Sequence, residues 1–330
     1  MMKRKNNGAA PAKIYTTGRT LKKRRGFGAV KNNLPLYAMF IPGFILTFMF
    51  AYMPMFGMII AFKQINLRDG ILGSPWVGFD NFRMLLRNEN AWTALRNTVL
   101  YNAVFISTGL VLAVTAALLL SMIRNKRASK VYQTIYIMPY FLSMVIVAYL
   151  VYAFLNMESG FINNSVLSTI FGVEEINWYA DAGAWPFILF IVNAWKTVGY
   201  NSIVYLAAMA GIDPGLYEAA EIDGASTWKQ ILHITLPSLR NIMIIMTILD
   251  IGRIFNSDFG LFYNVTMNSG ALYPTTLVIN TYVYNMMTAA GSASSGLSAA
   301  ASMLQSVLGF IMVLSANAIV RKIDKDSALF

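Results

Sequence analysis

Residues 217–240 read YEAAEIDGASTWKQILHITLPSLR, a charge-bearing stretch that lies between two long apolar segments. Residues 218–223 favour a helix, whereas Gly224 permits a break in the backbone or close packing. Apolar residues recur at helical spacing over 225–236, and Pro237 is expected to end that helix. The stretch therefore predicts two short helices at an angle to each other, facing water.

The side chains of this helical hairpin suit a docking surface for another protein. Small residues let a partner backbone approach closely, and carboxylates can bind basic side chains. The residues expected to contribute are Glu218, Ala219, Ala220, Asp223, Gly224, Ala225 and Pro237. The alternative interpretation is an ordinary amphipathic loop helix.

The composition indicates a membrane protein. Of the 330 residues, 57% are hydrophobic and 12% are charged, whereas soluble domains carry roughly 25% charged residues. The sequence has no Cys and a single histidine, His233, which excludes disulfides, thiolate metal sites and histidine-cluster metal chemistry. The net charge of +11 comes from basic residues beside apolar segments, which indicates anionic membrane lipid as a partner and not nucleic acid.

Six apolar stretches meet or approach the roughly 20 residues that a helix needs to cross the hydrocarbon core. They cover residues 36–62, 98–123, 131–154, 184–210, 242–262 and 296–320. Basic residues crowd the segment before the first stretch and follow the second and the sixth. The positive-inside rule therefore predicts that both termini are cytoplasmic, together with the loop over residues 212–240.

The predicted external loops are poorer in basic residues. Residues 156–183 and 263–295 contain neither Lys nor Arg, as expected outside the cell. The first external loop is the exception, because it carries Arg68, Arg83, Arg87 and Arg96.

Three ionisable residues lie within the predicted spans: Lys196 in the fourth, and Asp250 and Arg253 in the fifth. Such residues usually face a bundle interior or a water-filled path. Asp250 and Arg253 are three residues apart, so on one helix they share a face and can simply neutralise each other. Alternatively, Arg253 lines a polar translocation path together with Asn256, one turn further along.

A second candidate group surrounds Lys196. Its neighbours Trp195 and Asn193 carry aromatic and amide groups, which suit sugar faces and hydroxyls. A lysine at this position could equally extend its ammonium to a membrane interface.

The sequence carries no nucleotide-binding or catalytic motif. It has no G-x-x-x-x-G-K-[ST] loop and no Gly-Lys pair, so ATP and Mg²⁺ would have to bind a partner chain. It also lacks G-x-S-x-G and H-E-x-x-H motifs. We therefore expect no catalytic residues, no metal site and no cofactor on this chain.

Several motifs resemble the permeases of binding-protein-dependent ABC importers of the maltose-type class. Glu218-Ala-Ala, Gly224 and Leu236-Pro237 resemble their cytoplasmic coupling loop, and the likeness extends over nearly the whole chain after residue 34. The matching stretches are WVGFDNFRMLL (76–86), ALRNTVLYN (94–102), YIMPYFLSMVIV (136–147), GIDPGLYEAAEIDGAS (211–226) and QSVLGFIMVLSANAIVRK (305–322). FGMIIAFKQIN (56–66) and TYVYNM (281–286) look most like permeases for polyuronides and other complex oligosaccharides, including alginate.

The resemblance implies an all-α, polytopic fold of the ABC importer permease (MetI-like) type, with six transmembrane helices and a cytoplasmic coupling loop. It also implies a homologous second permease, a dimer of ATPase subunits and an extracytoplasmic solute-binding protein. In the family, the Glu and Gly that correspond to Glu218 and Gly224 seat the loop in a cleft of the ATPase. This sequence has Ile231 where a Phe is frequent, which is expected to alter only local packing.

These observations predict one permease subunit of an ATP-driven saccharide importer in the inner membrane of a bacterium. Residues 1–34 would form a basic cytoplasmic tail, 35–322 the permease domain and 323–330 a short cytoplasmic tail. A secondary transporter or channel is the alternative, although neither needs a docking hairpin, and no internal repeat is evident. A membrane sensor would require a signalling domain. The sequence does not name the sugar: Arg253 and Lys196 suit an acidic saccharide, whereas Asp250 argues against one.

Overall fold

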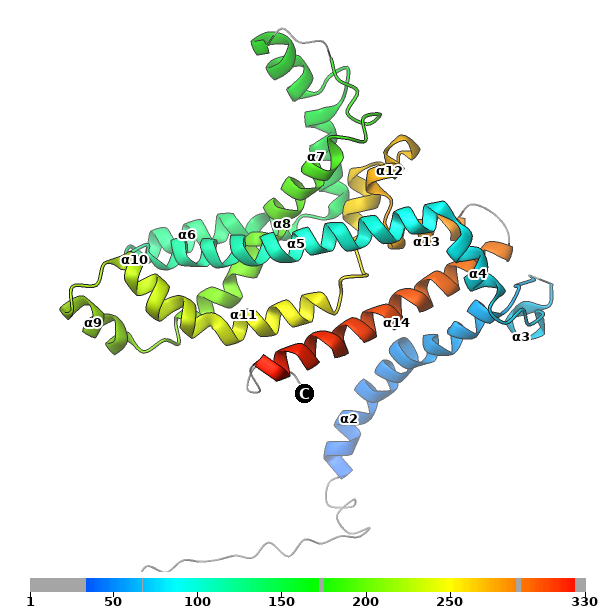
Figure 1. Ribbon diagram of the computed structural model, residues 1–330, viewed down its shortest axis with the longest axis horizontal. Helices are drawn as coiled ribbons and strands as arrows, with labels where there is room; N and C mark the ends of the chain where they lie inside the picture. Colours follow the sequence, from blue (N-terminus) through cyan, green and yellow to red (C-terminus); the bar gives the residue numbers. More distant parts are fainter. Residues whose placement is uncertain (1–33, 67, 172–174, 289–291, 324–330) are drawn as a thin grey trace, which may run out of the picture. The chain divides into compact units, whose positions relative to one another are not determined.

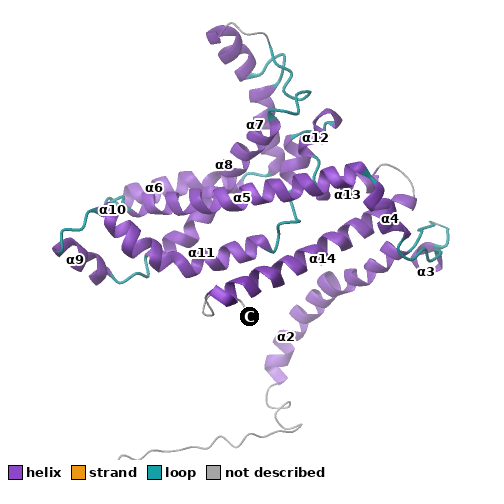
Figure 2. Ribbon diagram, in the orientation of Figure 1, coloured by secondary structure: helices purple, strands orange, loops and turns teal. Residues whose placement is uncertain are grey.

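The computed structural model describes residues 34–66, 68–171, 175–288 and 292–323. Helices, turns and loops account for these residues, and the only strand pairing among them is an isolated bridge between Lys63 and Trp76 (Figure 2). The predicted all-α class is therefore confirmed. The two predicted tails, 1–34 and 323–330, lie almost wholly outside the described residues.

The chain divides into two units, residues 1–57 and 58–330. The first unit contains α2 (Leu34–Thr47), which continues through a π-helical turn at Phe48–Tyr52 into a 3-10 helix at Met53–Phe62. Together these segments form an apolar run of 29 residues, long enough to cross a membrane.

Proline explains why this first span leaves α-helical geometry. Pro54 lacks an N–H, and its ring clashes with the carbonyl oxygen four residues earlier in a regular α-helix. The backbone accommodates it at the junction of the π-helical and 3-10 segments. Aromatic rings of Phe40, Phe44, Phe48 and Tyr52 follow one another along a single helix face at centroid separations of 5.6 to 6.4 Å.

The second unit is a set of packed helices (Figure 1). They are α3 (Gly70–Gly73), α4 (Asp80–Arg87), α5 (Glu89–Ser121), α6 (Lys126–Ile137), α7 (Met144–Leu155), α8 (Trp185–Met209), α9 (Pro214–Ile222), α10 (Thr227–Gln230), α11 (Leu236–Ile251), α12 (Tyr273–Thr276), α13 (Ile279–Thr288) and α14 (Ser292–Ile323). Short 3-10 or π-helical segments lie between them: η3 (Met138–Phe141), η4 (Ile162–Phe171), η5 (Ile231–Thr235), η6 (Leu261–Val265) and η7 (Gly270–Leu272). The long helix α5 packs against α8, and α11 packs against α5, α8 and α14.

Five described helices are long and apolar enough to cross a membrane, and a sixth span is formed if one bent pair counts as a single crossing. The bent pair is Lys126–Phe141 with Met144–Leu155, whose axes differ by 96°. The third apolar stretch, 131–154, is therefore a bent span and not a straight helix. Pro139 removes a backbone donor at the end of the first segment, and Ser143 caps the second by accepting from the N–H of Ile146 at 3.3 Å.

The fifth span also differs from the prediction. The helix runs over Thr227–Ile251, so it starts within the coupling loop and ends 11 residues before the predicted limit at 262. Residues 252–258 then form turns and irregular backbone before η6 begins. Hydropathy alone did not reveal this end, because the apolar residues at 259–262 extend the apparent stretch beyond the polar residues that follow the helix.

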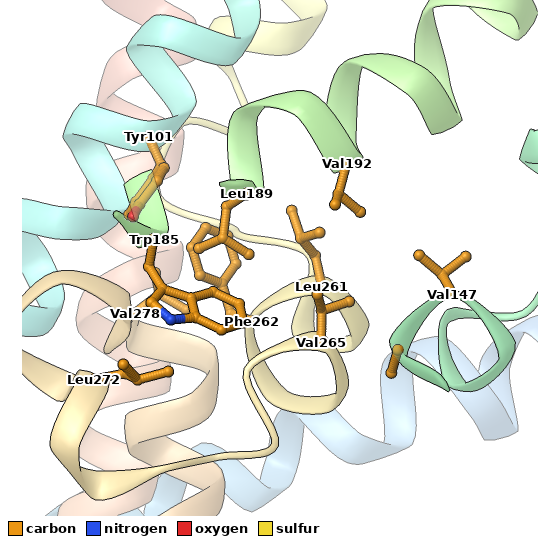
Figure 3. Close-up of a cluster of buried hydrophobic side chains, with 11 residues drawn as sticks. Tyr101, Val147, Trp185, Leu189, Val192, Leu261, Phe262, Val265, Leu272 and Val278 are labelled. Atoms are coloured by element: carbon orange, nitrogen blue, oxygen red, sulfur yellow. The ribbon is translucent and has the colours of Figure 1, made fainter. Parts of the chain in front are cut away.

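The largest buried cluster joins α5, α7, α8 and η6 (Figure 3). Trp185 is fully buried at the start of α8 and donates its indole N–H to the carbonyl oxygen of Trp178 at 2.6 Å. Tyr101 of α5 packs edge-on against Phe262 of η6 at a centroid distance of 4.8 Å. Through this cluster, α7 of the bent third span packs against η6, which follows the irregular segment.

A glycine at the start of α14 packs closely against the segment around residues 61–81. A Cβ atom on Gly296 would lie 2.7 Å from the side-chain nitrogen of Asn81 and 2.7 Å from the carbonyl oxygen of Lys63. The side-chain nitrogen of Asn81 stays beside Gly296 because it donates to the carbonyl oxygens of Ala61 and Lys63, at 2.8 and 3.1 Å. Only glycine fits at position 296 without a shift of the neighbouring backbone.

Candidate functional site: the coupling loop and the polar break

The coupling loop, residues 212–240, begins with a capped helix. Asp213 accepts the N–H of Gly215 at 2.9 Å and so caps α9, and Pro214 occupies the first turn. Gly224 ends the helix with a φ of +73°, and the N–H of Ala225 donates to the carbonyl oxygen of Ala220 at 2.8 Å. This geometry is a Schellman motif, so the predicted break at Gly224 is confirmed and follows from its left-handed backbone.

The second arm of the coupling loop differs from the prediction. We expected Pro237 to end it, but α10, η5 and α11 form one continuous helix over Thr227–Ile251. Pro237 lies in the first turn of α11, directly after the π-helical turn of η5. A π-helical turn changes the hydrogen-bond register and accommodates a proline that would break a regular α-helix. The second arm is therefore the N-terminal end of the fifth span itself.

The exposed side of the coupling loop carries both charge and apolar surface. Glu218 and Asp223 are exposed, and neither forms an ion pair within the described residues. Ala219, Gly224 and Pro237 are exposed as well, whereas Ala220 and Ala225 are half-buried. Four large apolar side chains on this loop are exposed as well, which the sequence did not indicate: Leu216, Ile222, Trp228 and Leu232. Ile222 and Trp228 are the most exposed, at 87% and 69%. Exposed apolar side chains of this size on a polar loop indicate a contact surface for a protein.

A polar break, residues 252–258, separates α11 from η6. Asn102 of α5 donates to the carbonyl oxygen of Ile254 at 2.8 Å, and Gln305 of α14 donates to that of Phe255 at 2.6 Å. Within a membrane, non-helical backbone is tolerated only where protein groups pair with it or where it lines a water-filled cavity. Two neighbouring spans thus supply the hydrogen bonds that the ended helix cannot.

A third helix completes this arrangement. The side chain of Asn280 on α13 accepts the N–H of Ser257 at 3.1 Å and donates to the side-chain oxygen of Asn256 at 2.8 Å. The side chains of Arg253 and Asn256 are exposed. The polar break therefore exposes a guanidinium and an amide, while side chains of α5, α13 and α14 form hydrogen bonds with its backbone.

The predicted Asp250–Arg253 pair is not formed. The helix ends at Ile251, so Asp250 lies in its last turn and Arg253 in the turn beyond. The backbone N–H of Arg253 donates to the carbonyl oxygen of Asp250 at 2.9 Å, but their side chains form no ion pair; the one ion pair in the described part of the chain joins Arg83 and Asp80. The regular helix ends between the two residues, so the spacing of a helical pair does not bring their side chains into an ion pair.

Lys196 lies elsewhere than either sequence interpretation predicted. Its side chain is buried in α8 and donates to the carbonyl oxygens of Pro139 and Tyr140, at 3.4 and 3.1 Å, and to that of Leu142. Its neighbour Trp195 is 47% exposed on a different face of the helix. The ammonium is thus buried within the protein, whereas the side chain of Trp195 is half-exposed. The carbonyl groups at the bend of the third span bind it instead.

A family model described as the binding-protein-dependent transport system inner membrane component matches residues 109–325. The chain belongs to this family. The matched region includes the whole coupling loop of this permease, the bend of its third span and the polar break. The resemblance inferred from the motifs is therefore confirmed, and the permease is a transporter subunit and not an enzyme.

Relatives extend over most of the permease. Protein LplB of Bacillus subtilis (strain 168) is 34% identical over 96% of both chains. The polygalacturonan/rhamnogalacturonan transport system permease protein YteP of the same strain is 34% identical, over 88% of this chain and 89% of YteP. A chain in the crystal structure of a bacterial ABC transporter involved in the import of the acidic polysaccharide alginate is 33% identical. That structure superposes with a TM-score of 0.81, over 90% of this permease and 98% of that chain.

The structure also assigns contacts to motif residues whose roles the sequence did not reveal. In ALRNTVLYN, Asn97 donates to the carbonyl oxygen of Leu277 at 3.0 Å, and the hydroxyl of Thr98 accepts the N–H of Ile279 at 2.9 Å. Thr98 thereby caps the start of α13, the helix that supplies Asn280. Polar residues within an otherwise apolar span were the available signal, but their partners lie about 180 residues away in the sequence.

Proposed function

We propose that this permease is one of two homologous membrane subunits of an ATP-driven importer that carries an oligosaccharide. The observation that carries the proposal is the 33% identity to the alginate transporter chain, at a TM-score of 0.81 over 90% of the permease. A second, equally similar structure is described as the alginate transporter with an alginate pentasaccharide-bound periplasmic protein. YteP is named for polygalacturonan and rhamnogalacturonan, which are also acidic. An acidic oligosaccharide delivered by an extracytoplasmic binding protein is the substrate that these likenesses favour.

The coupling loop would dock on a separate ATPase subunit, which binds ATP and Mg²⁺. Exposed carboxylates at Glu218 and Asp223 suit basic side chains, and the exposed side chains of Ile222 and Trp228 supply apolar contact area. The second arm of the loop continues without interruption into the fifth span. Movement of the docked loop would therefore tilt α11 directly. In this arrangement both chain termini and the coupling loop would lie on the cytoplasmic side of the membrane.

The polar break would line the translocation path. The guanidinium of Arg253 suits a uronate carboxylate, and the exposed amide of Asn256 suits sugar hydroxyls. Three rings follow on the adjoining segments: Phe259 lies 4.8 Å from Tyr263 and 4.9 Å from Tyr284, between ring centroids. Tyr284 is 39% exposed, which leaves aromatic surface for the apolar face of a sugar. Asn193 and Trp195 of α8 remain further candidates.

Purification of the affinity-tagged permease from membranes of its native host tests this proposal. We expect a second permease and an ATPase to co-purify in fixed stoichiometry, with ATP hydrolysis stimulated by binding protein loaded with an acidic oligosaccharide. Oligogalacturonide and alginate oligosaccharide are the acidic probes, and maltotriose is the neutral control. Isolation of the permease without an ATPase would contradict the coupling, whereas stimulation by maltotriose alone would contradict the acidic substrate.

A further inference from the structure

Lys196 is buried against the bend of the third span, where its ammonium donates to backbone carbonyl groups. The third span bends by 96° between η3 and α7, and at the bend the N–H of Leu142 donates to the carbonyl oxygen of Pro139 at 3.2 Å in a 3-10 turn. Three carbonyl oxygens at the bend, on Pro139, Tyr140 and Leu142, accept from the ammonium of Lys196. A lysine ammonium has three N–H donors, so the three carbonyl groups at the bend use all of them.

The same face of α8 holds the bend in two further ways. A Cβ atom on Gly199 would lie 1.9 Å from the carbonyl oxygen of Tyr136, so only glycine lets the two backbones approach this closely. The ring of Tyr200 stacks on that of Tyr140 with centroids 3.9 Å apart and planes within 6°. Residues 196, 199 and 200 lie three and four positions apart, on one face of the helix.

Electrostatics favours a cation at this place. The carboxyl end of a helix carries partial negative charge on its unpaired carbonyl groups, which a lysine ammonium offsets. No carboxylate pairs with Lys196 within the described residues, so the helix end itself is the counter-charge. A buried charge in a membrane is costly, and one held by backbone carbonyls alone points to a role in fixing their position.

We infer that Lys196 is a positioning residue that joins the bent third span to α8, so that both move together when the coupling loop moves. The inference rests on the proposed coupling function. The coupling loop follows α8 directly, because α8 ends at Met209 and α9 begins at Pro214. Beyond the bend, Val147 of α7 belongs to the same buried cluster as Leu261 of η6, which adjoins the polar break. Lys196 thus connects the loop to the path through contacts on the third span.

The bend can be measured directly, because the permease has no native cysteine. Spin labels on Lys126→Cys and Ala153→Cys, both exposed positions, report the distance between the two arms of the third span. In the assembled transporter we expect a narrow distance distribution, a broader and longer one with Lys196→Met, and a narrow one again with Lys196→Arg. Lys130→Met, which removes an exposed lysine from α6, is the matched control and should leave the distribution unchanged.

Coupling gives the second measurement. With Lys196→Met, we expect ATP hydrolysis to continue while saccharide uptake falls at least about tenfold, so that more ATP is consumed per sugar; Lys196→Arg should restore the ratio. If Lys196→Met fails to assemble, Lys196→Gln is measured in its place. Glutamine keeps an N–H donor but is shorter than lysine, so we expect a smaller shift in distance and a smaller rise in ATP consumed per sugar. The inference is overturned if assembled Lys196→Met transporter shows the same distance distribution as the unaltered protein, or consumes the same amount of ATP per sugar. Failure of the proposed function is distinguishable, because then the unaltered permease itself would show no saccharide-stimulated ATP hydrolysis.

Discussion

The hydroxyl groups of Tyr217 and Thr235 lie 2.9 Å apart and join the two arms of the coupling loop. Tyr217 belongs to α9, whereas Thr235 is buried in the helix that continues into the fifth span. One hydrogen bond therefore connects the exposed docking helix to the transmembrane helix that it would move.

Tyr217→Phe tests whether this bond makes the loop move as one body. The substitution keeps the ring and removes the hydroxyl, at a cost of about 1 kcal/mol for a typical hydrogen bond. We expect faster hydrogen exchange over 214–222 and a several-fold loss of coupled ATP hydrolysis. Tyr132→Phe, on an exposed residue of α6, serves as the control. Unchanged exchange in Tyr217→Phe would show that the arms are held by packing alone.

Glu218→Lys and Gly224→Leu test the docking surface. Charge reversal at an exposed carboxylate opposes basic groups of a partner, and a leucine at a φ of +73° strains the turn that ends α9. We expect both variants to insert into the membrane but to lose saccharide-stimulated ATP hydrolysis by tenfold or more. Normal stimulation in both would exclude the coupling loop as the ATPase contact.

Cysteine labelling tests the orientation that the basic residues predict. Single cysteines at Ser226 and Asn177 occupy exposed positions of the coupling loop and of the loop before α8. An impermeant maleimide added to sealed cells should label Asn177→Cys, and it should label Ser226→Cys only after the membrane is permeabilised. Equal labelling of both in sealed cells contradicts the six-span orientation.

Arg253→Met tests the polar break as a path for an acidic saccharide. Loss of the guanidinium should reduce uptake of an oligouronide about tenfold and uptake of a neutral analogue far less, because only the former carries a carboxylate. The double variant with Asp250→Asn should assemble without restoring uptake. Arg87→Met, an exposed arginine of α4, is the control. Near-normal oligouronide uptake by the double variant would show that Arg253 does not line the path. Asn193 and Trp195 of α8 would then be the next residues to test.

The sequence predicted most of the architecture, because apolar length and the turn residues are local signals. Gly224 illustrates this, since a glycine after a helix-favourable stretch indicates its end, and the left-handed backbone confirms that reading. Pro237 shows the limit of the same logic. The π-helical turn that accommodates it depends on register, which no single residue indicates.

The candidate site was less predictable, because it depends on contacts between distant segments. Asp250 and Arg253 have the spacing of a helical pair, but side chains of Asn102 and Gln305 hold the backbone where the helix ends. The buried position of Lys196 likewise depends on the bend near Pro139, which lies 57 residues away. Intramembrane charge correctly marked these places as unusual but did not show their partners.

The most direct test of the account is ATP hydrolysis by the purified complex in proteoliposomes, measured with and without saccharide-loaded binding protein. We expect hydrolysis to require the co-purified ATPase, to rise several-fold with an oligouronide-loaded binding protein, and to lose this stimulation in the Glu218→Lys permease. Stimulation that persists in Glu218→Lys at equal amounts of assembled complex would contradict the claim that the coupling loop transmits the work of the ATPase to this permease.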